Sequence, residues 1–511
     1  MSKVQQILLL SFSIFIIGCG ADSAKNSPME GGGEIVSASS MPIDDSSNRE
    51  EYDIIHENIF KDVKTSPLST FSVDVDTASY SNIRRYITVN NQLPPKDAVR
   101  TEEMLNYFNY SYNEPNSTQP FAINKYVGDT MWNSKTKIIH IGLQTQKVDF
   151  SELPASNLVF LIDVSGSMSA SNKLPLLKEA IKLLVEKLRE KDTVSIVVYS
   201  GSSGLVLDKA KGNEKEKILE ALNKLTAGGV TAGGEGIELA YKVALESFIE
   251  EGNNRVILST DGDFNVGQTS QRELEELIEE KRESGVYLTV LGFGMGNYKD
   301  NKVEALADKG NGNYAYIDNL LEAKKVLVTD MGGTLYTIAK DVKVQVQFNP
   351  LNVSQYRLIG YENRRLENEE FTDDKKDAGE VGMGHSVTVL YEIKSPSDEV
   401  NSDESRYTNT TYNDDLKDEL ATIKIRYKEP NSNTSKEITN FIKVNDKDIE
   451  KQDFDFTQSV VGFSMILRNS QYRDDLTIEK LIDLAQDAKG EDREGYRTEF
   501  IKLMRKVELL Q

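Results

Sequence analysis

Between residues 155 and 331, apolar runs with the length of strands alternate with runs that have the period of amphipathic helices. Residues 157–162 (NLVFLI) form a nearly continuous apolar run, as expected for a strand that is buried on both of its faces. After this strand, Leu177, Ile181 and Leu184 recur at helical spacing. The alternation predicts a doubly wound α/β domain, in which helices cover both faces of a mainly parallel sheet.

The same rhythm continues to the end of this region. Apolar runs predict strands at 194–199, 255–259, 286–292 and 314–317, and helical periodicity predicts helices at 218–225, 237–249, 274–280 and 303–307. In an open α/β sheet, ligands bind in the crevice beyond the carboxyl ends of the strands. The loops that follow these strands are therefore where functional residues are expected.

The segments on either side of the α/β region have different patterns. Residues 51–150 form a first folded region, with strands predicted at 71–75 and 137–144 and helices at 81–87 and 101–108. Residues 332–450 are predicted to be β-rich, because 342–348 and 386–393 alternate as antiparallel strands with one solvated face do. Residues 451–511 are predicted to be helical, with helices at 458–467, 478–488 and 500–509. We expect the β-rich segments on the two sides to pack together, so that the α/β domain (residues 155–331) is inserted between them.

The first residues have the pattern of a targeting signal. Lys3 precedes an apolar stretch of signal-peptide length, and residues 16–19 (IIGC) resemble the lipobox of bacterial lipoproteins. The resemblance implies that a signal peptide, residues 1–18, is cleaved before Cys19 and that the Cys19 sulfur is diacylated; an ordinary signal peptide with an incidental cysteine is the alternative. Residues 19–50 are predicted to be a flexible tether. The protein would then be anchored to a membrane of the bacterial cell envelope, the outer membrane or the periplasmic face, without spanning it.

The composition excludes several classes of partner and site. The chain has 60 Lys and Arg residues against 82 Asp and Glu residues, a formal net charge of −22, and no basic cluster that offsets this balance. Nucleic acid is not expected as a partner, because binding to it depends on the neutralisation of phosphates by Lys and Arg. The single cysteine excludes an intramolecular disulfide and a cysteine-rich zinc site, and the three histidines lie far apart in the sequence.

Oxygen-bearing side chains gather where predicted strands end. Asp163, Ser165 and Ser167 directly follow the strand at 157–162, and Asp261 directly follows the strand at 255–259. Thr231 lies in a glycine-rich segment before a predicted helix. Three hydroxyls and two carboxylates are hard oxygen ligands, which suit Mg²⁺, Mn²⁺ or Ca²⁺ and not zinc or copper.

This set resembles the metal-ion-dependent adhesion site of von Willebrand factor A (VWA) domains, as in integrin I domains. The family pattern is Asp-x-Ser-x-Ser, then a Thr, then an Asp, and all five positions are filled here in chain order. The resemblance implies a Rossmann-like fold and a divalent cation, with Mg²⁺ as the best match. It implies that Ser165 and Ser167 bind the cation directly, that Thr231 does so in the ligand-bound state, and that Asp163 and Asp261 bind directly or through water.

The flanking segments resemble the two terminal modules of a bacterial family of VWA-domain lipoproteins. The resemblance lies in residues 67–80 (PLSTFSVDVDTASY) and 93–100 (LPPKDAVR) at the N-terminal side, and in residues 454–510 at the C-terminal side. Asp74, Asp76 and Ser79 in the first of these allow three interpretations: a cap between a strand and a helix, a second metal site, or a phosphatase nucleophile loop, for which Ala78 stands where that family needs Thr.

The sequence leaves three classes of function open. The favoured class is a binding module, in which the cation captures an Asp or Glu side chain of a partner protein. The alternatives are a structural component of the envelope whose metal site is incidental, and a metal-dependent hydrolase. No nucleophile elbow, Walker A loop or His-Glu-x-x-His motif is present, so we predict that the protein is not an enzyme.

Overall fold

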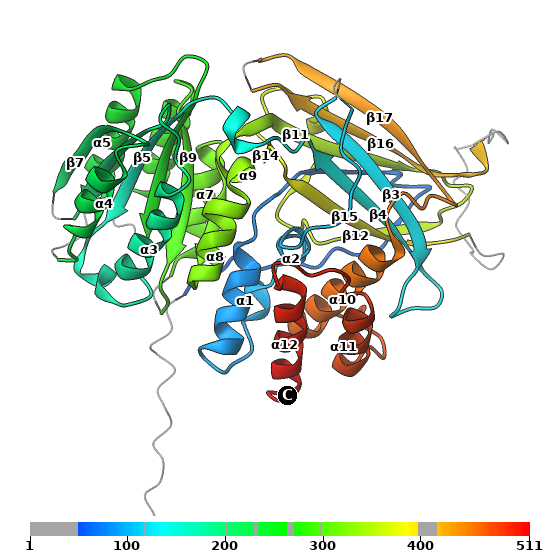
Figure 1. The fold of residues 1–511 in the computed structure, drawn as a ribbon. Helices are drawn as coiled ribbons and strands as arrows, with labels where there is room; N and C mark the ends of the chain where they lie inside the picture. The colour runs from blue at the N-terminus through cyan, green and yellow to red at the C-terminus, as the bar shows by residue number, and fades with distance from the viewer. Residues whose placement is uncertain are drawn as a thin grey trace, which may run out of the picture. The chain divides into compact units, whose positions relative to one another are not determined.

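The computed structural model describes residues 50–116, 119–200, 202–228, 233–262, 270–296, 298–396, 416–430 and 432–511. All of them belong to the unit formed by residues 47–511. This unit contains three sheets and a group of helices at the C-terminal end of the chain (Figure 1).

Six strands form the sheet of the α/β domain, in the order β10-β9-β8-β5-β6-β7. The parallel strands are β5 (Ser156–Asp163), β6 (Thr193–Tyr199), β8 (Asn253–Thr260), β9 (Tyr287–Phe293) and β10 (Tyr314–Ile317), and β7 (Ser203–Lys211) pairs antiparallel with β6. One face carries α3 (Leu174–Val185), α4 (Lys215–Asn223) and α8 (Leu320–Lys324), and the other carries α5 (Gly233–Glu246), α6 (Gln271–Arg282) and α7 (Asp300–Lys309). Helices on both faces of a mainly parallel sheet confirm the doubly wound fold.

The central strand β5 shows why this sheet needs two helical layers. Leu158 and Phe160 pack into the core under α3 and α4, whereas Val159 and Leu161 pack into the core under α5, α6 and α7. Every residue of β5 is buried. The apolar run that predicted this strand therefore reflects burial on both faces.

Two antiparallel sheets enclose a second core and form a sandwich. The first sheet has the order β1-β12-β15-β4-β3, and the second has the order β13-β2-β11-β16-β17, with β14 paired to β11. The first contains β1 (Lys61–Asp62), β12 (Gln355–Ile359), β15 (Ser386–Lys394), β4 (Lys137–Thr145) and β3 (Phe121–Asp129), and the second contains β13 (Arg365–Leu366), β2 (Leu68–Ser72), β11 (Thr337–Phe348), β16 (Glu419–Lys428), β17 (Ser435–Lys443) and β14 (Gly379–Gly382).

Both sheets of the sandwich join strands from before and after the α/β domain. In the first sheet, β4 pairs with β15 from Lys137↔Ile393 to Gln144↔Ser386. In the second sheet, β2 pairs with β11 from Leu68↔Gln347 to Ser72↔Lys343. The expected insertion of the α/β domain between β-rich flanking segments is therefore confirmed.

Strand β15 differs from the prediction that it has one solvated face. Seven of its nine residues are buried. Val387, Val389 and Tyr391 face the sandwich core, whereas Leu390 packs among the C-terminal helices on the other face. The polar residues on that outer face keep their hydrogen bonds under the helices, which is why a strand with an alternating sequence can be covered on both sides.

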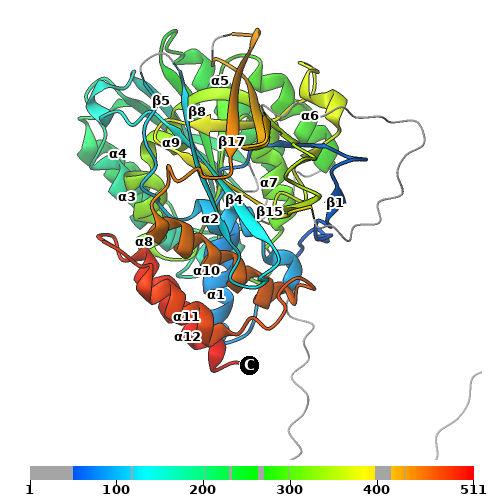
Figure 2. The same cartoon turned by 90° about the vertical axis from the view of Figure 1, so that its right-hand side faces the viewer.

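Five helices share a core on the outer side of the first sheet. They are α1 (Ala78–Thr88), α2 (Thr101–Asn106), α10 (Lys451–Arg468), α11 (Ile478–Asp487) and α12 (Tyr496–Glu508), and Figure 2 shows α10 between the sheet and the other C-terminal helices. Phe108, Phe456, Phe463 and Phe500 meet edge to face in their core. The helical C-terminal region is confirmed. Shorter helical turns are Lys96–Ala98, Phe150–Glu152, Gly166–Ser169, Lys325–Thr329, Met331–Leu335 and Asn368–Phe371.

A buried ion-pair network holds the α/β domain against the helices. The Arg84 guanidinium on α1 pairs with Asp318, which follows β10, and with Glu322 on α8 at 2.7 Å. It also pairs with Glu499 on α12 at 3.0 Å and donates to the Tyr107 hydroxyl at 2.9 Å. Because the removal of one partner from a buried ion pair leaves an uncompensated charge, this network fixes one arrangement of the three elements.

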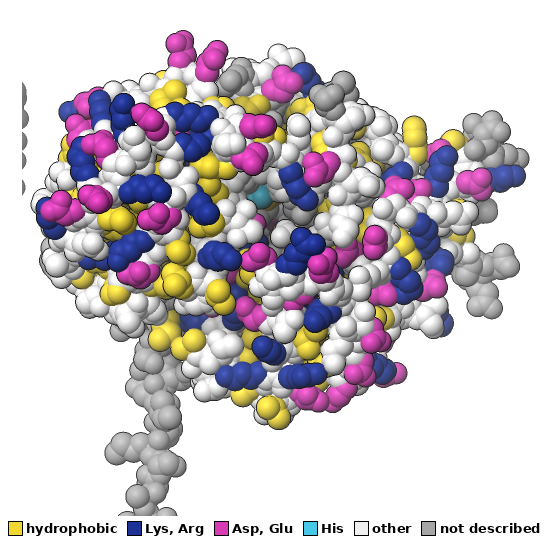
Figure 3. All heavy atoms as spheres, in the orientation of Figure 1, with side chains coloured by type: hydrophobic (Ala, Val, Ile, Leu, Met, Phe, Trp, Pro, Cys, Tyr) yellow, Lys and Arg dark blue, Asp and Glu magenta, His cyan; other side chains and the backbone are white. Residues whose placement is uncertain are grey.

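The described surface shows no segment suited to crossing a bilayer. Among the described helices, none combines the length and the apolar character that a membrane span requires. On the face shown in Figure 3, acidic and basic side chains are interspersed. The predicted signal peptide, tether and Cys19 lie outside the described residues.

We predict that Gly142→Ala in β4 lowers the free energy of unfolding by about 1–3 kcal/mol, as overpacking of a core does. A Cβ atom at this position would lie 2.4 to 2.7 Å from three ring atoms of Tyr112. The ring cannot move away easily, because its hydroxyl is hydrogen-bonded to His140 at 2.7 Å and to Thr388 at 2.9 Å. Denaturant unfolding measures the change.

Gly204→Ala in β7 is the matched control, because its Cβ would meet only Val198 Cγ2, at 3.9 Å. It should change the free energy of unfolding by less than about 0.5 kcal/mol. Equal effects of the two substitutions would contradict the packing described around Tyr112.

Candidate metal centre

The carboxyl end of β5 places a carboxylate and two hydroxyls in one turn. Asp163 is the last residue of β5 and is fully buried. Its Oδ1 atom accepts a hydrogen bond from the Ser165 backbone amide at 2.8 Å, and its Oδ2 atom accepts one from the Tyr199 hydroxyl at 3.3 Å. These contacts fix the carboxylate at the edge of the sheet.

The two serine hydroxyls of this turn point toward each other. Ser165 Oγ lies 2.9 Å from Ser167 Oγ. Neighbouring ligands of an octahedral Mg²⁺ ion, each at about 2.1 Å from the ion, lie roughly 3 Å apart. The spacing of the two hydroxyls therefore fits two adjacent positions of such a coordination shell.

Asp261 follows the neighbouring strand β8 and is buried at the same edge of the sheet. Its Oδ2 atom accepts a hydrogen bond from Lys173 Nζ at 2.8 Å, and Lys173 lies just before α3. Gly262 has a φ of +85°, which lets the chain turn away immediately after Asp261. No sequence pattern indicated Lys173 as part of this site. Its ammonium group partly balances the Asp261 charge and occupies one oxygen of that carboxylate.

The structure brings Asp163, Ser165, Ser167 and Asp261 to one edge of the sheet, whereas Thr231 lies outside the described residues. The set is acidic and partly buried. Burial raises the pKa of Asp163 to about 6; hydrogen bonds from Ser165 lower it, and the nearby Asp261 carboxylate raises it. A cation at this edge would stabilise the ionised form of Asp163.

The Asp74, Asp76 and Ser79 segment does not form the second metal site that its sequence allowed. Ser79 Oγ donates to the Ala98 carbonyl at 2.7 Å and accepts from the Arg100 amide at 2.9 Å, so this hydroxyl is engaged with the backbone. The segment joins β2 to α1 with Thr77 at the N-cap position, as the cap interpretation expects, although the Thr77 side chain makes no hydrogen bond to the helix. Instead, the amide of Ser79 donates to a carboxylate of α2, Glu103 Oε2, at 2.7 Å.

Asp74 lies instead beside two carboxylates from distant parts of the sequence. One ligand oxygen of Asp74, of Glu103 on α2 and of Glu304 on α7 all lie within 4.8 Å of one another. Burial raises the pKa of Glu103 to about 8 and that of Glu304 to about 7. Neither Glu103 nor Glu304 belongs to a motif, so the sequence carries no signal that could join them to Asp74.

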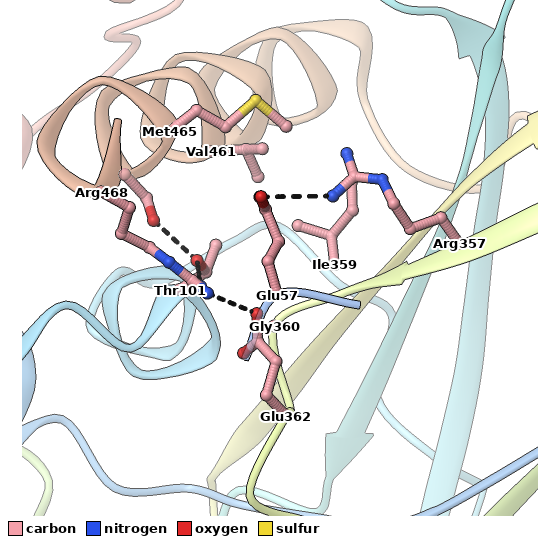
Figure 4. A pocket seen from close by; sticks show the side chains of 10 residues that line it. Glu57, Thr101, Arg357, Ile359, Gly360, Glu362, Val461, Met465 and Arg468 are labelled. Atoms are coloured by element: carbon pink, nitrogen blue, oxygen red, sulfur yellow. Dashed lines mark hydrogen bonds and ion pairs between the residues drawn. The ribbon is translucent and has the colours of Figure 1, made fainter. Parts of the chain in front are cut away.

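A small closed cavity lies nearby, between α10, α2 and β12. Figure 4 shows the Arg468–Glu362 and Arg357–Glu57 ion pairs in its wall, at 2.8 and 3.7 Å. The cavity has a volume of about 10 Å³, which is near the smallest volume that can hold one water molecule. It is too small for a metabolite.

Three family models match consecutive parts of the chain. The model described as von Willebrand factor matches residues 46–140, that of the von Willebrand factor type A domain matches 157–328, and that of "Uncharacterized protein YfbK, C-terminal" matches 333–510. The chain is 42% identical over 462 residues to "Uncharacterized protein YfbK" of Escherichia coli (strain K12), which covers 89% of this chain and 80% of that relative. The chain belongs to the YfbK family.

Two further similarities of this YfbK-family chain cover less of the chain or are weaker. Inter-alpha-trypsin inhibitor heavy chain H3 of Homo sapiens is 30% identical over 172 residues, which is 32% of this chain and 19% of that relative. The solved structure of von Willebrand factor type A from Catenulispora acidiphila is 15% identical, with a TM-score of 0.42, and covers 77% of this chain and 91% of that chain.

The α/β domain of this YfbK-family protein is thus a VWA domain. Domains of this type commonly bind a divalent metal. The donor set at the carboxyl edge fits such an ion, because two hydroxyls at octahedral spacing lie in the same turn as a buried carboxylate.

In metal-free protein, we predict that the stability contributed by Asp163 falls as pH rises from about 4 to about 6. The folded pKa of about 6 lies above the ordinary value of 3.8, so the folded state binds this proton more tightly than the unfolded chain does. The side chain of Asp163→Asn is neutral at every pH. The free energy of unfolding of this variant should therefore exceed that of the wild type at pH 7.5 in EDTA by on the order of 2 kcal/mol.

Unfolding midpoints in EDTA between pH 4 and pH 8 measure this difference, which should vanish near pH 4. With saturating Mg²⁺ the wild type should be more stable than the variant, because the variant lacks a ligand carboxylate. Asp208→Asn on the exposed strand β7 is the control and should show neither effect. If the Asp163→Asn variant is less stable than the wild type at pH 7.5 in EDTA, burial does not destabilise the ionised Asp163 carboxylate, and the prediction is wrong.

Proposed function

We propose that this protein binds a divalent cation at the carboxyl edge of its VWA domain and uses it to hold an acidic side chain of a partner protein. The cation is best matched by Mg²⁺, and the proposed ligands are Asp163, Ser165, Ser167, Thr231 and Asp261. The observation that carries the proposal is the 2.9 Å separation of the two serine hydroxyls beside the buried carboxylate of Asp163.

The balance of charged and neutral ligands favours binding over catalysis. Two carboxylates match the charge of a divalent ion. Hydroxyls supply most of the remaining ligands, and because they are neutral they leave the ion able to attract a further carboxylate. When bound, such a cation offers an open coordination position to a carboxylate. The partly exposed edge favours this use, because Ser167 is exposed while Asp163 and Ser165 are buried.

Two of the three described histidines, His140 and His385, support the proposal that the protein is not an enzyme. His140 is buried between Tyr112 and the helix α10, and His385 lies against Gly333 beyond the α/β domain. Neither is part of the edge that holds Asp163. A hydrolytic metal site usually combines an activated water with a general base, and no imidazole among these residues is placed for that role.

The alternative is a structural envelope component whose metal site is incidental. The sandwich and the helical layer together form a rigid support to which the α/β domain is held by buried ion pairs such as Arg84–Glu322. In this alternative, the sandwich or the helices make the contacts with other envelope proteins, so assembly does not depend on the cation.

We predict that Ser165→Ala/Ser167→Ala abolishes cation-dependent capture of envelope proteins. The double variant removes two neutral ligands and leaves the fold intact, because both side chains bond mainly to each other. Capture from envelope extract is compared with and without EDTA, and Mn²⁺ uptake is followed by titration calorimetry. Wild-type capture should be lost in EDTA.

Ser169→Ala is the matched control, because Ser169 is an exposed serine in the same turn. It should bind Mn²⁺ and capture partners as the wild type does. Capture that persists both in EDTA and in the double variant would favour the structural alternative. Loss of Mn²⁺ uptake in the control would show that the turn, and not the two hydroxyls, determines binding.

We also propose that the protein is a lipoprotein of the bacterial cell envelope, anchored through Cys19. The proposal is supported by the apolar leader and by the position of the chain's single cysteine after Gly18. Cys19→Ser should move the protein from the membrane fraction to the soluble fraction, because the acyl chains supply the membrane affinity. Fractionation followed by mass spectrometry of the N-terminal peptide measures this. A membrane-bound Cys19→Ser protein would contradict lipid anchoring.

A further inference from the structure

Buried carboxylates outnumber cationic groups at the junction between the α/β domain and the N-terminal segment. Two guanidinium groups, those of Arg100 and Arg364, are surrounded by six carboxylates. The acidic residues are Asp74, Asp76, Glu103, Asp300, Glu304 and Asp308, each of which makes at least one ion pair with these two arginines. The Asp308 side chain is 41% exposed and the other five are at most 12% exposed. Two arginines cannot balance five largely buried ionised carboxylates, and an uncompensated buried charge is costly.

Three of these carboxylates converge from three separate segments. Asp74 follows β2, Glu103 is on α2, and Glu304 is on α7 of the α/β domain, and one oxygen of each lies within 4.8 Å of the others. Asp74 is 4% exposed, Glu103 is 0% exposed, and the Glu304 side chain is 12% exposed. Distances up to this limit fit the coordination shell of Ca²⁺, in which oxygens at about 2.3–2.6 Å from the ion lie up to roughly 5 Å apart.

A buried oxygen of Asp74 has no hydrogen bond. Asp74 Oδ1 accepts from the Asp76 amide at 2.9 Å, whereas Asp74 Oδ2 accepts from no described group. The nearest cation to Oδ2 is Arg364 Nε at 3.3 Å, and this nitrogen also makes no hydrogen bond. The same Arg364 guanidinium pairs with Glu304 at 3.1 Å, so Asp74 Oδ2 and Glu304 lie beside one cationic group. Buried oxygens in proteins are almost always satisfied, which makes this one an indication of a missing partner.

The three carboxylates are also held in place. Glu103 is fixed by the amide of Ser79 at 2.7 Å and by the Arg100 guanidinium, and Glu304 is fixed by Arg364. Each carboxylate oxygen can accept more than one contact, so these bonds leave free lone pairs on all three groups. A group of anchored carboxylates with free lone pairs is arranged for a hard cation.

We propose that Asp74, Glu103 and Glu304 bind a second divalent cation of the size of Ca²⁺. Asp74 and Glu103 lie in the N-terminal segment, and Glu304 lies on α7, so the ion joins the α/β domain to the N-terminal segment. This site is distinct from the carboxyl edge of β5, and the proposal does not depend on the function proposed above. The ion acts as a structural clamp that supplies the positive charge that the two arginines lack.

The test uses full-length protein in detergent that carries Ser165→Ala/Ser167→Ala, so that the first site no longer contributes. After removal of free metal, this background should retain one equivalent of Ca²⁺ by elemental analysis. Adding Glu103→Gln/Glu304→Gln, which keeps the shape of both side chains, should remove that equivalent. Adding Glu276→Gln/Glu280→Gln on the exposed side of α6 is the control and should leave it bound.

A second measurement uses the background protein without further substitution, and therefore does not depend on how the glutamine variants fold. Tb³⁺ should bind and be sensitised by the buried tyrosines of this junction, such as Tyr314, whose hydroxyl donates to Asp300 at 2.7 Å. Ca²⁺ should displace Tb³⁺ and should raise the unfolding midpoint, because it binds only the folded state. A background protein that retains no Ca²⁺, shows no sensitised Tb³⁺ emission and unfolds at the same temperature with and without Ca²⁺ would overturn the proposal; protons would then neutralise the cluster.

Discussion

The pairing of β4 with β15 is the constraint on which the other features of this fold depend. It brings together two strands that are separated by the whole α/β domain, and it aligns them over their full length. The chain leaves the sandwich after β4, in the first sheet, and returns to it at β11, in the second sheet, so both connections to the α/β domain start from the sandwich. The domain is thereby held from the side where β5 begins, and the carboxyl end of β5, with Asp163, lies at the opposite end of that strand.

Burial on a second face explains where the sequence predicts this fold well and where it does not. The strands of the α/β domain are apolar on both faces, so their positions follow from local composition, and β10 was predicted with its observed bounds, Tyr314–Ile317. The alternation in β15 predicted a solvated face, but α10 covers it, and nothing near residue 390 in the sequence indicates a helix that begins at Lys451. Eight of the described strands were not predicted. Strands β3, β7 and β17 lie at sheet edges and carry many polar residues, and β1, β12, β13 and β14 are short. Strand β16 is an interior strand, but charged residues interrupt its apolar sequence.

The same distinction applies to the two polar sites. Asp163, Ser165 and Ser167 lie within five residues, so a motif reveals them, and the order of strands β5 and β8 in the sheet brings Asp261 to the same edge. Lys173 contacts Asp261, yet a single lysine before a helix has no distinguishing pattern. Glu103 and Glu304 lie about two hundred residues apart in the sequence. They come together only where α2 of the N-terminal segment lies beside α7 of the α/β domain. Sites made by local turns can be predicted from one sequence, whereas sites made by the docking of modules require the structure.

Glu50 and Glu51, the first described residues, contact α1 and the loop after β9, near the edge that holds the candidate metal centre. The Glu50 carboxylate accepts from the Gly296 amide at 2.8 Å and pairs with Arg85 of α1 at 2.7 Å. The amide of Glu51 donates to the Tyr298 carbonyl at 3.1 Å. These contacts hold the loop after β9, in which Gly294 has no side chain and lies against the aliphatic part of Lys173, the partner of Asp261. The residues that come directly after the predicted tether and the carboxylate at the sheet edge therefore belong to one continuous set of contacts.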